Sequence, residues 1–208
     1  IAEFLFKLTS TSMIESKSLK LYLHSLNGEI FDNEEDYKNT LTHDLSAAAG
    51  EEVKVVLIPL TSRYYLTGNV IEGRSLDKAK NFELHSKPDG EILQISDQPV
   101  QGEELYSELF RSLCPITGQP DWATFQINYS GSKISEHSLL AYACSFRDHP
   151  SYHEDCGERI FNDISEYCKP TDLTISLNFL RRGGIDINVY RSTNTLVEKR
   201  FLARLVRQ

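Results

Sequence analysis

The sequence predicts an α+β protein in which antiparallel sheets carry helices on one side. The order strand–helix–helix–strand occurs twice along the 208 residues, which indicates a duplicated module. The two copies can be aligned, because "LTHDLS" at 41–46 matches "IFNDIS" at 160–165 and "VKVVLIPL" at 53–60 matches "LTISLNFL" at 173–180. In both copies, segments with helical spacing of apolar residues lie between segments that alternate or are wholly apolar, as strands do.

The first module begins with an alternating strand, "IAEFLFKLTS" at 1–10. Apolar residues at helical spacing predict a helix over 16–27. A second helix is expected from an N-cap at Asn33 to a stop at Gly50, and a buried strand follows at 52–60.

The second module repeats this order. Its expected elements are a strand at 122–131, helices at 134–146 and 151–168, and a strand at 173–179. Lys169-Pro170 ends the second helix, and Gly183-Gly184 turn the chain into a last strand, "IDINVY".

Residues 61–113 are expected to be an insertion that connects the modules. This segment carries a predicted hairpin turn, "KPDGE" at 87–91, and a predicted acidic helix, "GEELYSELFRSL" at 102–113. The chain is therefore divided into an N-terminal module at 1–60, a connector at 61–113 and a C-terminal module at 114–208.

The composition is that of a folded soluble protein, with 40% apolar and 25% charged residues. The net charge of −8 argues against nucleic-acid or anionic-membrane partners, so a polyphosphate ligand would need a local cluster of Lys and Arg. The longest apolar runs are too short to span a bilayer, and no signal peptide is visible. Because the first strand starts without a preceding methionine, we expect the first module to lack its N-terminal segment.

The four cysteines, Cys114, Cys144, Cys156 and Cys168, form no C-x-x-C pair. This spacing favours neither a disulfide framework nor a zinc site, and it is typical of a reduced, cytoplasmic protein. His149 and His153 are four residues apart, but Pro150 marks a helix start between them, so the sequence predicts no metal site.

Cys114 is the first candidate for chemistry, because it lies in a Pro/Gly-rich loop before a strand, an unusual place for a packed thiol. Its ordinary pKa leaves little thiolate at neutral pH, so a base or a positive charge nearby is required. Asp121 follows seven residues later, and His153 with Glu154 opens a helix. The other three cysteines are expected to lie in helices and in the core.

Each further signal also has a purely structural explanation. Asp121 could cap a turn, His153 and Glu154 could start a solvated helix, and Glu15 could do the same before the first helix. The "RRGG" at 181–184 could be a turn with exposed arginines.

Three functions fit this set of residues. A Cys–His hydrolase or acyl-transferase would use Cys114 as nucleophile and His153 as base. A reductase would form an adduct at Cys114 and take hydride from a cofactor. A non-catalytic purine- or pterin-binding module would use Glu15 or Glu154 to hold a heterocycle. No G-x-G-x-x-G follows a strand, which excludes a Rossmann site.

Four motifs together resemble one family: "CPITGQPDWA", "IESKSLKLYL", "FRDHPSYHEDCGERIFND" and "RRGGIDINVYRS". The chain is similar, over essentially its whole length, to the NADPH-dependent 7-cyano-7-deazaguanine reductases of queuosine biosynthesis, in the two-module branch. The resemblance implies tandem T-fold modules, which associate side by side into a barrel, and a reaction that converts a nitrile to a primary amine.

The resemblance implies that Cys114 attacks the nitrile carbon as a thiolate to give a covalent thioimide, and that Asp121 protonates the nitrile nitrogen. For this role Asp121 must be protonated near neutral pH, which requires a raised pKa. Two NADPH molecules are then expected to supply two hydrides while the covalent bond retains the intermediate. No metal is implied.

The resemblance also assigns binding residues. The substrate's guanine-like edge is expected at Ile14, Glu15, Ser16, His153 and Glu154, and His153 is expected to orient the nitrile or assist proton movement. NADPH is expected at Ser16, Lys17, Arg182 and Gly183, with Lys20 and Arg181 as additional charges for phosphates. The implied partner is a small 7-deazapurine, and a cytoplasmic homodimer is expected.

Overall fold

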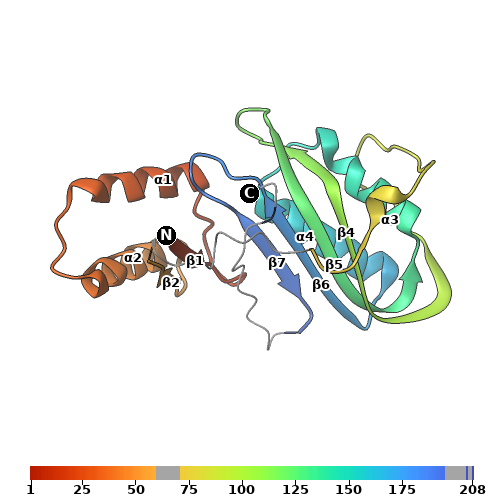
Figure 1. The fold of residues 1–208 in the computed structure, drawn as a ribbon, viewed down its shortest axis with the longest axis horizontal. Coiled ribbons are helices and arrows are strands. Elements are labelled where there is room, and N and C mark those ends of the chain that lie inside the picture. The colour runs from red at the N-terminus through yellow and green to blue at the C-terminus, as the bar shows by residue number, and fades with distance from the viewer. Residues whose placement is uncertain (60–70, 195–204, 206–207) are drawn as a thin grey trace. The chain divides into compact units, whose positions relative to one another are not determined.

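The structure is a computed structural model that describes residues 1–59, 71–194, 205 and 208 (Figure 1). The chain divides into two compact units, Ile1–Tyr64 and Tyr65–Gln208, and each is described by itself. Every helix within the described residues is too short or too polar to cross a membrane.

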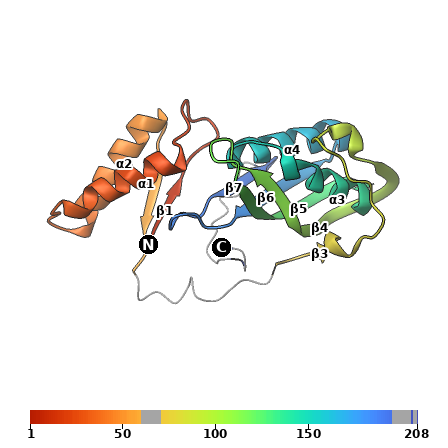
Figure 2. The same ribbon diagram turned by 90° about the horizontal axis from the view of Figure 1, so that it is seen from above.

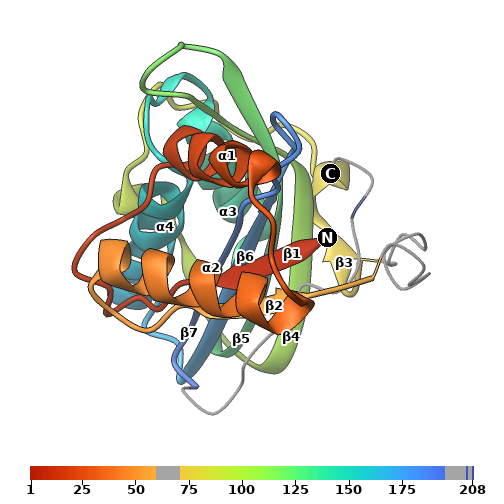
Figure 3. The same ribbon diagram turned by 90° about the vertical axis from the view of Figure 1, so that its left-hand side faces the viewer.

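The first unit contains a two-stranded antiparallel sheet and two helices. Its elements in chain order are β1 (Ala2–Leu5), α1 (Ser16–Ser25), α2 (Glu34–Ala49) and β2 (Lys54–Leu57), with a 3-10 turn at Leu26–Gly28. Figure 3 shows α1 and α2 in front of the two strands. Leu41 and Leu45 of α2 and Val55 of β2 are buried. The expected order strand–helix–helix–strand is confirmed in this unit.

Local signals set the ends of α2 as predicted. The Asn33 side chain accepts a hydrogen bond from the backbone N–H of Asp36, and Gly50 ends the helix in the left-handed conformation with φ +70°. An N-cap side chain satisfies one of the unpaired N–H groups of the first turn, and glycine adopts positive φ without steric cost.

The second unit is a five-stranded sheet with two helices on one face (Figures 1 and 2). The strands are β3 (Arg74–Ser75), β4 (Ile95–Leu113), β5 (Pro120–Ile134), β6 (Asp172–Phe179) and β7 (Asn188–Ser192), and the helices are α3 (Glu136–Cys144) and α4 (His153–Cys168). Short 3-10 turns lie at Leu76–Lys78, Gly90–Ile92 and Ser145–Asp148. The sheet order is β3-β4-β5-β6-β7, antiparallel throughout except for β3 with β4.

Alternate residues of β5 and β6 form the core between the sheet and the helices. The buried side chains on this face include Phe125, Ile127, Ile175 and Leu177, and they pack with Ile160 of α4. Because side chains alternate between the faces of a strand, the residues between them lie on the opposite face. That face is polar: Gln126 donates to Asn178 at 2.9 Å.

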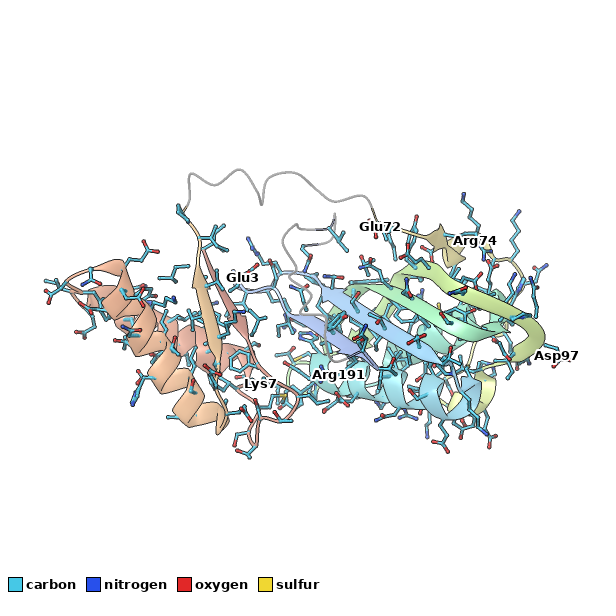
Figure 4. The ribbon with its side chains drawn as sticks, turned by 90° about the horizontal axis from the view of Figure 1, so that it is seen from below. Glu3, Lys7, Glu72, Arg74, Asp97 and Arg191 are labelled. Carbon is cyan, nitrogen blue, oxygen red and sulfur yellow. The ribbon has the colours of Figure 1, made fainter. Side chains whose placement is uncertain are left out.

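Ion pairs connect the outer strands of the second unit to neighbouring elements. Figure 4 labels two of the arginines that form them, Arg74 and Arg191. Arg74 of β3 pairs with Glu103 of β4 at 2.8 Å and with Glu136 of α3. Arg191 of β7 pairs with Glu158 of α4. These contacts join outer strands to neighbouring elements.

Two expectations for the connector were wrong. Residues 102–113, expected as a helix, are part of β4, and no hairpin turn lies at 87–91, where Asp89 instead caps a 3-10 turn. The pairing of β4 with β5 shifts register between Ser107 and Phe110. Such a bulge breaks the period-two pattern of a strand, and pairing with a neighbouring strand outweighs local propensity.

The expected connector at 61–113 is therefore not a separate insertion. Its residues 95–113 form β4, which pairs along β5 and belongs to the unit that begins at Tyr65. The sheet of the second unit consequently starts well before residue 114.

Substitution of Gly157 by alanine should destabilise the second unit. A Cβ at Gly157 in α4 would lie 2.3 Å from Cγ1 of Val189. We expect Gly157→Ala to lower the free energy of unfolding by about 1–3 kcal/mol, although alanine favours a helix by about 1 kcal/mol. Urea unfolding measures this cost. In a Val189→Ala background the same change should cost much less, because only the Val189 Cβ, at 3.2 Å, remains close, and an equal cost in both backgrounds would contradict the proposed clash.

Candidate active site

Cys114 lies in the tight loop that connects β4 to β5. The strands pair up to Leu113 and Pro120, and the Cys114 N–H then donates to the Gln119 carbonyl at 2.9 Å. Gly118 has φ +66° and donates its N–H to the Cys114 carbonyl at 2.9 Å. The loop therefore fixes the backbone of Cys114, while its side chain is half-buried.

Asp121 is the second residue of β5, and its side chain is only 3% exposed. One carboxylate oxygen accepts a hydrogen bond from Nη1 of Arg182 at 2.8 Å. The other lies 3.3 Å from Nε2 of His153, the first residue of α4. The imidazole of His153 also packs on Phe179, with ring centroids 4.0 Å apart. The structure thus brings Asp121, His153 and Arg182 together.

The structure does not supply the raised pKa that the proton-donor role of Asp121 requires. Burial alone would raise the pKa of Asp121, but His153 and Arg182 outweigh it, so the pKa lies below its ordinary value. A carboxylate between two such groups is favoured in its charged form. Asp121 is therefore a carboxylate in the site described here.

Arg182 reaches this site from a turn after β6. Arg182 and Ile185 exchange two backbone hydrogen bonds around Gly183 and Gly184, which have φ +60° and +89°. Positive φ at both central residues is what a type I′ turn requires. The Arg182 guanidinium also donates to Gln119 Oε1 at 2.6 Å and approaches Thr117 Oγ1 at 3.5 Å.

Arg181 does not share this position. It forms two hydrogen bonds with Asp186, from Nε at 2.8 Å and from Nη2 at 3.0 Å. The charge of Arg181 is thus paired with a bidentate carboxylate in this structure, and its role toward phosphates stays a prediction.

The surroundings of Cys114 favour its thiolate. Burial raises the pKa of Cys114, but the Thr117 hydroxyl, the backbone N–H groups of Ile116 and Thr117, and Arg182 together lower it below its ordinary value. The other cysteines are buried, and burial raises the pKa of Cys156 to about 11 and of Cys168 to about 12. Cys114 is therefore the cysteine of this unit that is accessible and also has a lowered thiol pKa.

Four of the expected binding residues lie in the first unit. Glu15 caps α1, because its carboxylate accepts hydrogen bonds from the backbone N–H groups of Lys17 and Ser18, both at 2.9 Å. These bonds outweigh burial and lower the pKa of Glu15. Ser16 and Lys17 are the first residues of the helix, and Ile14 precedes them half-buried. Glu15 therefore has the helix-capping role that the sequence allowed. Its carboxylate still has lone pairs that could accept hydrogen bonds from a ligand.

Glu154 follows His153 in α4, and both side chains are partly exposed. Thr117 and Gln119 contact Arg182 but were not predicted from the sequence. Their position between Cys114 and Asp121 in "CPITGQPD" is the sequence feature that could have indicated them. The described residues contain no cluster of His, Cys, Asp and Glu that could hold a metal ion.

Comparison with known proteins shows the family of the chain. Residues 1–57 match the family model described as "Nitrile reductase, 7-cyano-7-deazaguanine-reductase N-term", and residues 120–198 match the model "QueF-like protein". A relative from Hydrogenovibrio crunogenus, named NADPH-dependent 7-cyano-7-deazaguanine reductase, is 42% identical over 208 residues, which is 100% of this chain and 74% of the relative. The chain belongs to the family of NADPH-dependent 7-cyano-7-deazaguanine reductases.

Other reductases of the family give the same result. The relative from Desulfotalea psychrophila is 43% identical over 93% of this chain and 71% of its own length. The one from Buchnera aphidicola is 41% identical over 100% of this chain and 79% of its own length. A solved structure of the archaeosine synthase QueF-Like in the apo form covers 47% of this chain and 94% of its own, with 17% identity and a TM-score of 0.41.

The thiol environments predict selective labelling. At pH 7, iodoacetamide should modify Cys114 before Cys144, Cys156 and Cys168, because the pKa of Cys114 is lowered and the others are buried with raised pKa values. Peptide mass spectrometry measures each site, and labelling in urea is the control in which all four should react. Equal labelling in the folded protein would contradict the assignment.

The charge on Asp121 should make stability depend on pH. Because its folded pKa lies below its ordinary value, its contribution is present above that ordinary value and is lost as pH falls through the folded pKa. Asp121→Asn should therefore lower the free energy of unfolding at pH 7, on the order of 1–3 kcal/mol, because Arg182 and His153 lose a buried partner.

At pH 3 the difference between Asp121→Asn and the parent should be smaller than at pH 7. Asp172→Asn, which removes an exposed carboxylate at the start of β6, is the matched control for the loss of one negative charge. A difference that grows as the pH falls would contradict the ion-paired state of Asp121.

Proposed function

We propose that this chain reduces the nitrile of 7-cyano-7-deazaguanine to an aminomethyl group with NADPH, through a covalent thioimide at Cys114. Family membership supports the overall reaction. The observation that carries the residue assignment is the guanidinium of Arg182, which donates to the buried carboxylate of Asp121 and helps to lower the pKa of the Cys114 thiol. A nucleophile and a proton carrier are thus held around one cation.

The first step joins the Cys114 sulfur to the electrophilic nitrile carbon. One π bond of the nitrile breaks, and its nitrogen takes up one proton to give the thioimide. Because Asp121 is a carboxylate, it first accepts a proton and then passes it to this nitrogen. Cys114 attacks as a thiolate, so this proton comes from solvent, in place of the one that the thiol released when it ionised. His153, 3.3 Å from Asp121, orients the carboxylate.

NADPH supplies the hydrides for the remaining reduction, two in all, and two protons complete the amine. The residues present fit this group: Arg182 is 34% exposed, and Lys17 is exposed at the start of α1 beside Ser16. We assign Ser16, Lys17, Arg182 and Gly183 to its binding. Cationic side chains and N–H groups are suited to phosphate oxygens.

Recognition of the heterocycle is assigned to carboxylates. Glu154 and Glu15 would accept hydrogen bonds from the N–H groups of the guanine-like edge, with Ile14, Ser16 and His153 beside them. The carboxylate of Glu154 follows His153 directly in α4, which supports its place near the nitrile. Carboxylates that accept from the substrate's N–H groups would discriminate against bases that lack these donors.

We infer that the chain folds as tandem T-fold modules. The order β4-β5-α3-α4-β6-β7 in the second unit, with both helices on one face, supports a complete module there. The order β1-α1-α2-β2 supports a second, shorter copy in the first unit. A cytoplasmic homodimer without direct nucleic-acid contact remains our expectation for the assembled enzyme.

Covalent capture of the substrate tests this function. Mixing the protein with 7-cyano-7-deazaguanine in the absence of NADPH should add the mass of one substrate molecule, as measured by intact-protein mass spectrometry. Cys114→Ala should show no adduct, and Asp121→Asn should form it at least tenfold more slowly because the proton carrier is lost.

With NADPH present, two molecules should be oxidised for each amine formed. Cys144→Ala, which removes a buried thiol elsewhere in the second unit, is the matched control and should retain the adduct. A folded parent that binds the base but gains no mass would contradict Cys114 as the nucleophile, and hydrolysis without NADPH would indicate a hydrolase.

A further inference from the structure

The two acidic groups of the site share the positive charge of Arg182. Nη1 donates to Asp121 at 2.8 Å, and the same guanidinium also lowers the pKa of the Cys114 thiol. Nη2 donates to Gln119 at 2.6 Å. Two groups that can each carry a negative charge therefore share one positive charge.

The surroundings of Asp121 show what else influences its charge. Within the described residues, His153 and Cys156 face it from α4, and Arg182 faces it from the turn after β6. Cys114 belongs to the loop before β5 whose Thr117 and Gln119 contact the same guanidinium. Arg182 is the permanently charged cation of this set, since arginine stays protonated in proteins.

Arg182 and Asp121, which form an ion pair, differ in how far their side chains are exposed to solvent. The side chain of Arg182 is 34% exposed, whereas that of Asp121 is 3% exposed. An anionic ligand can therefore reach the guanidinium without entering the pocket of Asp121. A phosphate dianion offers Arg182 a bidentate partner with more charge than the carboxylate.

We propose that Arg182 serves two partners in turn. In the free site its guanidinium stabilises the anionic forms of Cys114 and Asp121. When the cofactor binds, its phosphate draws the guanidinium away from these two groups, and the site then takes up protons. This inference rests on the assignment of Arg182 to the cofactor made above.

The exchange would serve two steps of the reaction that need opposite protonation states in the site. Attack on the nitrile requires a thiolate, and the guanidinium stabilises that thiolate while it remains in the free site. Reduction of the thioimide requires protons at nitrogen, and Asp121 accepts a proton more readily once the guanidinium has moved away. Gln119 is a neutral partner, so it holds the guanidinium near the site without competing for it by charge.

The pH dependence of Cys114 alkylation tests the exchange. Iodoacetamide labelling of Cys114, resolved by peptide mass spectrometry, is measured across the titration of the thiol with and without saturating NADP⁺. We expect NADP⁺ to raise the midpoint by on the order of one pH unit, a tenfold change in thiolate. Simple obstruction by the ligand would lower the rate at every pH and leave the midpoint unmoved.

Arg182→Gln should reproduce the effect without a ligand. Its midpoint should already be raised, and NADP⁺ should move it little further. Lys78→Gln, which removes one exposed positive charge elsewhere in the same unit, is the matched control and should behave like the parent. If Arg182→Gln fails to fold by circular dichroism, Gln119→Ala loosens the same guanidinium and should raise the midpoint by a smaller amount.

Calorimetric titration with NADP⁺ distinguishes failure of the exchange from failure of the assignment of Arg182 to the cofactor. NADP⁺ that binds the parent without moving the midpoint would overturn the exchange and leave the proposed function intact. Absence of NADP⁺ binding to the folded parent would overturn the assignment of Arg182 to the cofactor, and the exchange with it.

Discussion

The pairing of β4 with β5 is the constraint on which the second unit depends. The ladder ends at Leu113 and Pro120, so its short connection places Cys114 at one end of the sheet. The next strand pair, in which Ala123 faces Phe179, brings the turn after β6 to the same end. The chain then positions a thiol, a carboxylate and a guanidinium from three segments through backbone hydrogen bonds, which hold side chains more rigidly than a mobile loop would.

The buried charge of Asp121 is stabilised by one group on each side of the carboxylate. A carboxylate with 3% exposure loses most of its hydration, and that loss is offset by Arg182 on one oxygen and His153 near the other. The same arrangement makes the pair sensitive, because removal of either partner leaves an uncompensated group in a low-dielectric pocket. Structure and reactivity here depend on one set of contacts.

Sequence reasoning found the features that local chemistry determines. Asn33 and Gly50 mark the ends of α2 through their own side chain and backbone, and the alternation of β5 and β6 reflects one buried face. It missed β4, because strand pairing is non-local and a bulge disrupts the period. It left the charge of Asp121 open, since the partners that lower its pKa, His153 and Arg182, lie far along the chain. Family resemblance names residues but does not fix the protonation state of each.

Arg181 and Arg182 show how strand geometry separates neighbours of the same type. The tight turn at Gly183 and Gly184 keeps the two arms of the hairpin paired, and successive side chains of an extended arm point to opposite faces. Arg181 therefore meets Asp186 across the hairpin, while Arg182 meets Asp121. The first pair braces the turn, and the second reaches the site. A shift of one residue in this hairpin would exchange the two roles and leave Asp121 buried without its cation.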